Sequence, residues 1–240
     1  MSRCPSVRWQ GRHVIDAMGL SRLLQLASPM LPVGAYSYSQ GLEWAVEEGT
    51  VHDAASAEQW IGDVLQYSMC SFELPVLWRL CHAWQDEDNA GILHWNERMC
   101  AGREAAESQA ETLQMGYSLC RLLESLEEGG NPHLVKVQAI PAKSFPAVYA
   151  CAVAIWQIPA IAAVHAYAWS WIENQVSAAM KTIPLGQVAG QRMLLSLGAR
   201  LPVLVDRACS LLDAELSNFA PGFALAACQH ETQYSRLFRT

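Results

Sequence analysis

The sequence predicts an all-α protein, a single-domain bundle of about ten helices. Apolar residues recur at helical spacing along most of the chain, whereas no stretch shows sustained strand alternation or an Asn-Gly hairpin turn. The 240 residues are 52% hydrophobic, which supplies a sizeable core and excludes intrinsic disorder. Because the chain has no repeat and no low-complexity linker, we expect one helical domain over residues 18–228 and a separate tail over residues 229–240.

The first half of the chain divides into helices at its Pro, Gly and Asp residues. Residues 20–27 predict a short amphipathic helix that ends at a Ser-Pro pair, and a loop rich in Pro, Gly, Ser and Tyr follows. The segment GLEWAVEEG predicts a helix ended by Gly49, and Asp53 or Ser56 can cap the next helix. Pro75 should break or kink the path into a further helix.

One long helix is predicted over residues 90–126. Its apolar residues recur every seven positions, at Ile92, Met99, Ala106, Leu113 and Cys120. Gly102 and Gly116 interrupt this helix, at about 1 kcal/mol each relative to alanine unless a neighbouring helix approaches closely there. Later in the chain, a helix opens near Pro184, and Pro202 is expected to open another at a first-turn position.

A run without charge, residues 144–172, raises the question of a membrane span. Pro159 divides the run into halves of core-helix length that are rich in alanine and lack leucine. Gln157, His165 and Ser170 would need partners inside lipid, and no Lys/Arg cluster flanks the run. We therefore predict a pair of buried helices, with a membrane-associated protein as the alternative.

Charge and cysteine usage narrow the class of protein. The chain has 16 Lys+Arg against 23 Asp+Glu, a net charge of −7, and no basic run, which argues against nucleic-acid binding. Eight scattered cysteines without a C-x-x-C pair indicate a reduced, cytoplasmic protein. Residues 1–17 carry three arginines but lack the apolar segment of a signal peptide, so we expect a disordered extension; a transit-like segment is the alternative.

No sequence pattern of a catalytic or cofactor site stands out. The chain has neither G-x-x-x-x-G-K-[ST] nor G-x-G-x-x-G nor G-x-S-x-G. The adjacent Cys81-His82 and the His94/Cys100 pair are poorly spaced for holding one metal ion. These patterns favour a binding or assembly protein with no stably bound cofactor over an enzyme.

Three segments resemble the UreF family of urease accessory proteins. They are LLQLASPMLPVGAYSYSQGLEWAVEEG (residues 23–49), the block YAWSWIENQVSAAMKTIPLGQVAGQRMLLSL (residues 167–197) and HETQYSRLFRT (residues 230–240). The sequence departs from the family at Ala35-Tyr36 and Tyr38, where many members have Gly-Phe and a later His or Trp, and at Ala106 and Gln109, where the family tends to carry arginine.

The resemblance implies a non-enzymatic co-chaperone that forms a homodimer. Proteins of this family bind UreD (also called UreH) and recruit the GTPase UreG, and the assembly delivers nickel to apo-urease with GTP hydrolysis in UreG. Nickel and GTP would thus be handled by the complex, with no metal or cofactor held by this chain. The alternative is a direct nickel carrier or metal-handling enzyme that uses Cys and His residues.

Three groups of residues are candidate contacts. In the tail, which we expect to be mobile until UreD/UreH binds, they are His230, Glu231, Tyr234, Arg236, Phe238 and Arg239. For the dimer or partner surface they are Pro32, Gly34, Tyr36 and Tyr38 of the loop, together with Glu43, Tyr167 and Trp171; simple covering of the core is the alternative for the loop. For a polar lining near the dimer surface they are Glu173, Gln175, Lys181 and Gln187, with internal pairing as the alternative.

Overall fold

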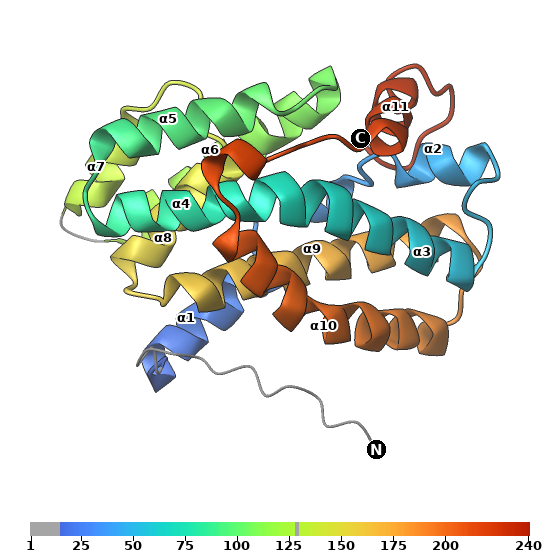
Figure 1. The fold of residues 1–240 in the computed structure, drawn as a ribbon, viewed down its shortest axis with the longest axis horizontal. Helices are drawn as coiled ribbons and strands as arrows, with labels where there is room; N and C mark the ends of the chain where they lie inside the picture. The colour runs from blue at the N-terminus through green and yellow to red at the C-terminus, as the bar shows by residue number, and fades with distance from the viewer. Residues whose placement is uncertain (1–14, 128–129) are drawn as a thin grey trace.

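The computed structural model describes residues 15–127 and 130–240, and in these ranges the fold is all-α, as predicted. Figure 1 shows a bundle in which the end of the chain lies beside α2 and α11. The prediction for residues 1–17 falls almost entirely outside the described residues. The α-helices are α1 Ala17–Ala27, α2 Leu42–Glu47, α3 Ala54–Val64, α4 Leu74–Gln85, α5 Asn89–Ala101, α6 Ala106–Leu126, α7 Pro132–Gln138, α8 Phe145–Ile155, α9 Ala160–Thr182, α10 Gln187–Ser210 and α11 Pro221–His230.

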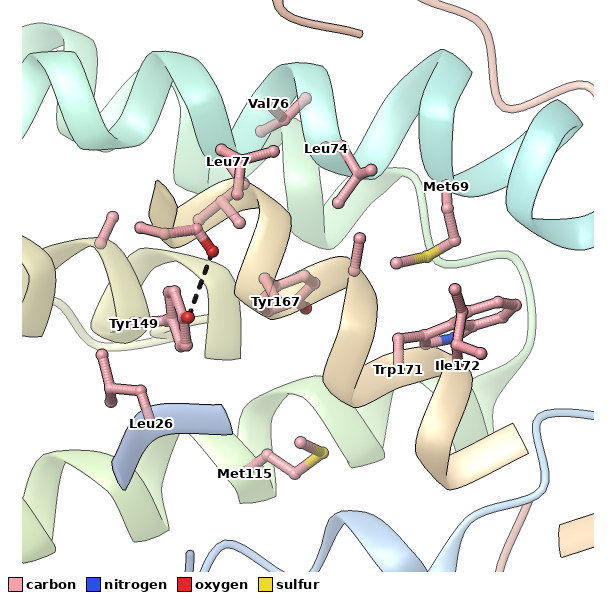
Figure 2. Close-up of a cluster of buried hydrophobic side chains, with 14 of the residues drawn as sticks. Leu26, Met69, Leu74, Val76, Leu77, Met115, Tyr149, Tyr167, Trp171 and Ile172 are labelled. Carbon is pink, nitrogen blue, oxygen red and sulfur yellow. Dashed lines mark hydrogen bonds between the residues drawn. The ribbon is translucent and has the colours of Figure 1, made fainter. Parts of the chain in front are cut away.

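Helices α4 and α9 form the centre of the bundle. Helix α4 packs against α5, α8 and α9, while α9 also packs against α1 and α10. Figure 2 shows Leu74 and Leu77 of α4 and Tyr167, Trp171 and Ile172 of α9 within one cluster of buried side chains. The uncharged run is therefore the buried pair α8 and α9, as predicted, and no helix within the described ranges is long and apolar enough to cross a membrane.

Helices α3 and α4 are joined by a π-helical segment, η2 (Leu65–Glu73), directly before Pro75. Proline has no N–H and its ring displaces the carbonyl four residues earlier, so the Ser71 carbonyl loses its usual helical partner. The Ser217 N–H takes that place and donates to the Ser71 carbonyl at 3.0 Å. The chain stays helical from α3 through η2 into α4, so the break predicted at Pro75 does not occur. The proline instead leaves the Ser71 carbonyl as a docking point for the segment after α10.

The long helix predicted over residues 90–126 is wrong, because the chain breaks between α5 and α6. Gly102 ends α5, and a Cβ there would lie 2.3 Å from the Phe72 ring. The break also shifts the heptad register, so Ala106 is exposed although Ile92 is buried. At Gly116, by contrast, the expected close approach exists, because a Cβ would lie 2.3 Å from the Lys143 carbonyl oxygen.

Two expectations for the C-terminal third also need correction. Pro202 lies inside α10 and does not begin a new helix; Figure 1 shows α10 bending along its length. Helix α11, which the apolar pattern did not predict, ends at His230 and takes the first two residues of the expected tail into the helix.

Candidate partner-binding site

The loop between α1 and α2 is shaped by two glycines with positive φ. Gly34 (φ +82°) precedes the short 3-10 helix η1 (Ala35–Ser37), and Gly41 (φ +80°) precedes α2. A Cβ on Gly41 would lie 2.9 Å from the Ala227 backbone nitrogen, so α11 rests directly on this turn. Both glycines therefore allow a left-handed backbone conformation, and Gly41 also allows the close approach of α11.

The C-terminal tail packs along this loop in the structure. Its mobility before UreD/UreH binds stays a prediction. The Arg239 N–H donates to the Ser37 carbonyl at 2.8 Å. The main-chain oxygen of Thr240 accepts from the Ser39 and Gln40 N–H groups at 2.6 and 3.0 Å. Of the tail side chains, Phe238 and Thr240 are buried. The two most distinctive segments of the sequence thus form one structural unit.

Glu43 on α2 binds the backbone of the tail from the interior side. Its carboxylate accepts the N–H groups of Leu237 at 2.6 Å and Phe238 at 3.1 Å. A third contact comes from His230, whose Nε2 lies 3.1 Å from Glu43 Oε2. Because the Glu43 side chain is 9% exposed and His230 is fully buried, neither side chain presents a contact surface to a partner.

Glu107 in the first turn of α6 holds the other side of His230. Its Oε2 lies 3.0 Å from His230 Nδ1, and its Oε1 accepts from Arg236 at 2.5 Å. Carboxylate oxygens only accept hydrogen bonds, so the ring satisfies both acids when both its nitrogens carry protons. Glu231 in turn accepts from the Glu107 backbone N–H at 3.3 Å, which suits an acid at a helix N-terminus.

Glu111, one turn further along α6, receives the end of the tail. Gln40 Nε2 and the Thr240 hydroxyl donate to its two oxygens at 2.7 and 3.2 Å. Burial raises the pKa of Glu111 to about 7, an effect that the positive charge of Arg103 opposes. The Gln40 oxygen accepts from Trp171 Nε1 at 2.7 Å, which links the loop to α9.

Tyr167 and Trp171 are interior residues, so their predicted place on a dimer surface is wrong. They are 5% and 8% exposed, and Figure 2 shows both within the core. The Tyr167 hydroxyl donates to Glu73, which also forms a 2.7 Å ion pair with Arg103. Arg103 reaches this position from the break between α5 and α6.

The surface of this unit is an open groove beside the tail. Its lining consists of Tyr36, Ser37, Lys181, Leu237, Phe238 and Arg239. The Lys181 ammonium lies 5.5 Å from the Phe238 ring centre, within cation–π range. Lys181 and Arg239 are exposed, and the Leu237 side chain is 73% exposed. Such a surface, with two cations and apolar side chains, suits an acidic partner segment with an apolar anchor.

The remaining predicted residues divide between surface and interior. Pro32, Gly34 and Gln187 are exposed, Tyr234 extends fully into solvent, and Tyr38 is buried. Gln175 lies in the interior: it is 2% exposed, and its Nε2 has no hydrogen-bond partner among the described residues. Its predicted place in a surface lining is therefore wrong.

Glu173 is half-buried on α9 near the loop. Burial raises the pKa of its carboxyl group, and burial followed by the Glu173 charge raises the pKa of Tyr36 to about 12. Helix α9 therefore meets the loop through the charge of Glu173 near Tyr36 and through Asn174, which donates to the Tyr38 carbonyl at 3.1 Å. Lys181 is the α9 residue that lines the groove.

Several residues of the site were missed in the sequence. The acids Glu107 and Glu111 stand four residues apart on α6, and Gln40 has a positive φ of 54° that is uncommon for a non-glycine residue. The spacing of the two acids places them on one face of a helix, but only the fold brings the tail to that face. Within the described ranges, no group of three or more His, Cys, Asp or Glu residues is placed to hold a metal ion.

The described residues thus form an all-helical bundle in which the docked tail and the loop border an exposed groove with two cationic side chains. Comparison with known proteins identifies the family, since the UreF family model matches residues 51–198 of this chain. The chain belongs to the UreF family of urease accessory proteins.

Individual relatives match over almost the whole chain. A urease accessory protein UreF of Methylobacillus flagellatus is 58% identical over 221 residues, covering 92% of this chain and 97% of the relative. One from an Azoarcus species is 56% identical, covering 92% of this chain and 95% of the relative. A bifunctional urease accessory protein UreEF of Bordetella bronchiseptica is 47% identical over 94% of this chain, which spans 53% of that longer protein.

Proposed function

We propose that this chain is a non-catalytic co-chaperone of urease maturation that acts in the cytoplasm as a homodimer. It binds UreD/UreH, recruits the GTPase UreG, and supports GTP-dependent nickel insertion into apo-urease, while nickel and GTP are handled by the complex. The observation that carries the proposal is the groove of Lys181, Arg239, Tyr36 and Phe238, because its exposed charges and apolar side chains have the composition of a protein-binding surface.

The bifunctional relative supports a role beside other accessory proteins. In that protein a UreF-like portion is joined to a further portion in a chain named as a urease accessory protein UreEF. A fusion raises the effective concentration of its two parts for one another, which favours proteins that work together.

Removing both groove cations is expected to weaken UreD/UreH binding at least tenfold. The Lys181→Ala/Arg239→Ala variant removes two exposed charges and leaves the Arg239 backbone contact with Ser37 in place. Interface charges of this kind steer and hold a complementary partner. The measurement is co-purification with UreD and UreG, followed by titration of the purified variant with UreD.

The matched control is Arg121→Ala, because Arg121 is 64% exposed and stands near the opposite end of α6 from the tail. This control should bind UreD like the unmodified chain. Equal UreD affinity for the groove variant and the control would reject the groove as the partner-binding site.

A further inference from the structure

Three acids hold the end of α11 and several residues of the C-terminal tail on the body of the protein. We call Glu43, Glu107 and Glu111 the carboxylate clasp. Their carboxylates are contacted by the following groups from the end of α11 and the tail: both ring nitrogens of His230, the Arg236 guanidinium, the N–H groups of Leu237 and Phe238, and the Thr240 hydroxyl.

The clasp lies beneath the groove rather than in it. Glu43 and Glu111 are each 7% exposed, and none of the three acids is among the groove-lining residues. Leu237 joins the two layers, because its N–H binds Glu43 while its side chain is 73% exposed at the groove. A partner in the groove would therefore contact the tail but not the acids that hold it.

Apolar packing alone is a weak anchor for this tail. Between residues 234 and 240, Phe238 is the one buried large apolar side chain, whereas Tyr234 and Leu237 face solvent. Hydrogen bonds to charged groups are stronger than those between neutral groups. The clasp therefore holds the tail wall of the groove together with the backbone hydrogen bonds that Arg239 and Thr240 make to the loop.

We propose that Glu43, Glu107 and Glu111 are positioning residues for partner binding, which hold Leu237, Phe238 and Arg239 in place as one wall of the groove. This role rests on the proposed function. The clasp acts through the tail, so its loss displaces the wall without removing any side chain that a partner touches.

The test combines amide hydrogen exchange at Leu237 and Phe238 with UreD affinity for the same variants. Glu43→Ala removes both acceptor oxygens and should speed exchange at these two amides by roughly tenfold or more. Glu43→Gln keeps one acceptor oxygen and should give a smaller increase, a partial rescue that a general loss of folding would not show. UreD affinity should fall in the same order.

Two controls make the outcomes distinct. Glu97→Gln changes an exposed acid on α5 and should leave exchange and affinity unchanged. Lys181→Ala/Arg239→Ala should lower affinity while the Leu237 and Phe238 amides stay protected.

The positioning role is overturned if Glu43→Ala leaves the two amides protected. It is also overturned if exchange speeds up while UreD affinity holds and the groove variant binds weakly. If the groove variant itself binds UreD normally, the proposed function fails, and that result differs from the others because the groove cations have no effect.

Discussion

Replacing Arg103 by methionine is expected to lower the free energy of unfolding by about 3–5 kcal/mol. Arg103 is the ion-pair partner of Glu73, at 2.7 Å, and Glu73 is 6% exposed. Methionine fills much of the same volume but leaves Glu73 as an uncompensated charge beside Glu111, which is itself buried. Removing one partner of a buried pair costs far more than removing an exposed pair, because the remaining charge keeps its desolvation penalty.

Urea unfolding of the Arg103→Met variant measures this effect. The matched control is Arg121→Met, which breaks an exposed Arg–Glu pair within α6 and should cost less than about 1 kcal/mol. If the two variants lose similar amounts of unfolding free energy, the Arg103–Glu73 pair contributes no more to stability than an exposed pair, which would contradict the prediction.

The stability of the fold should fall between pH 4.5 and pH 7 through Glu111. Burial raises the pKa of this carboxyl group from 4.5 to about 7, so the folded chain keeps a proton that the unfolded chain releases. Because the folded state binds more protons over this window, the free energy of unfolding decreases as the pH rises, and the lowering is complete above pH 7. The shift corresponds to a change on the order of 3 kcal/mol.

Glu111→Gln removes this titration while keeping an oxygen for Gln40 and an amide group beside Thr240. Its stability relative to the unmodified chain should therefore increase from pH 5 to pH 8, as measured by urea unfolding at both values. Glu97→Gln, an exposed acid on α5, should show no such change. A pH-independent difference for Glu111→Gln would mean that its carboxyl group titrates alike in the folded and unfolded chains.

The fold followed from local patterns wherever packing agreed with them. The uncharged run split at Pro159 into α8 and α9, and Asp53 caps α3 through the Ser56 N–H at 2.8 Å, as expected. The prediction of one long helix was wrong at Gly102 because the break there has a tertiary cause. The Phe72 ring of η2 occupies the space that a side chain at residue 102 would need. The same break brings Arg103 to Glu73. The position at which the helix prediction was wrong is therefore a structurally important one.

The sequence indicated which segments form the candidate site, but not which role each of their residues has. Loop and tail were singled out by Pro, Gly, Tyr and Arg residues that helix packing does not require, and the structure places them side by side. Burial could not be read from the sequence, so His230 and Glu43 resembled partner contacts although they face one another inside the fold. The pairing partners Glu107 and Glu111 depend on contacts more than 120 residues apart in the chain.

The central claim is that the tail and loop together form the partner-binding surface. Its most direct test is a hydrogen-exchange footprint of the purified chain with and without UreD. We predict that UreD slows exchange in residues 35–38 and 234–240 and leaves α7, which lies far from α11 and the tail (Figure 1), unchanged. Protection elsewhere, with both of these segments exchanging as in the free chain, would contradict the claim.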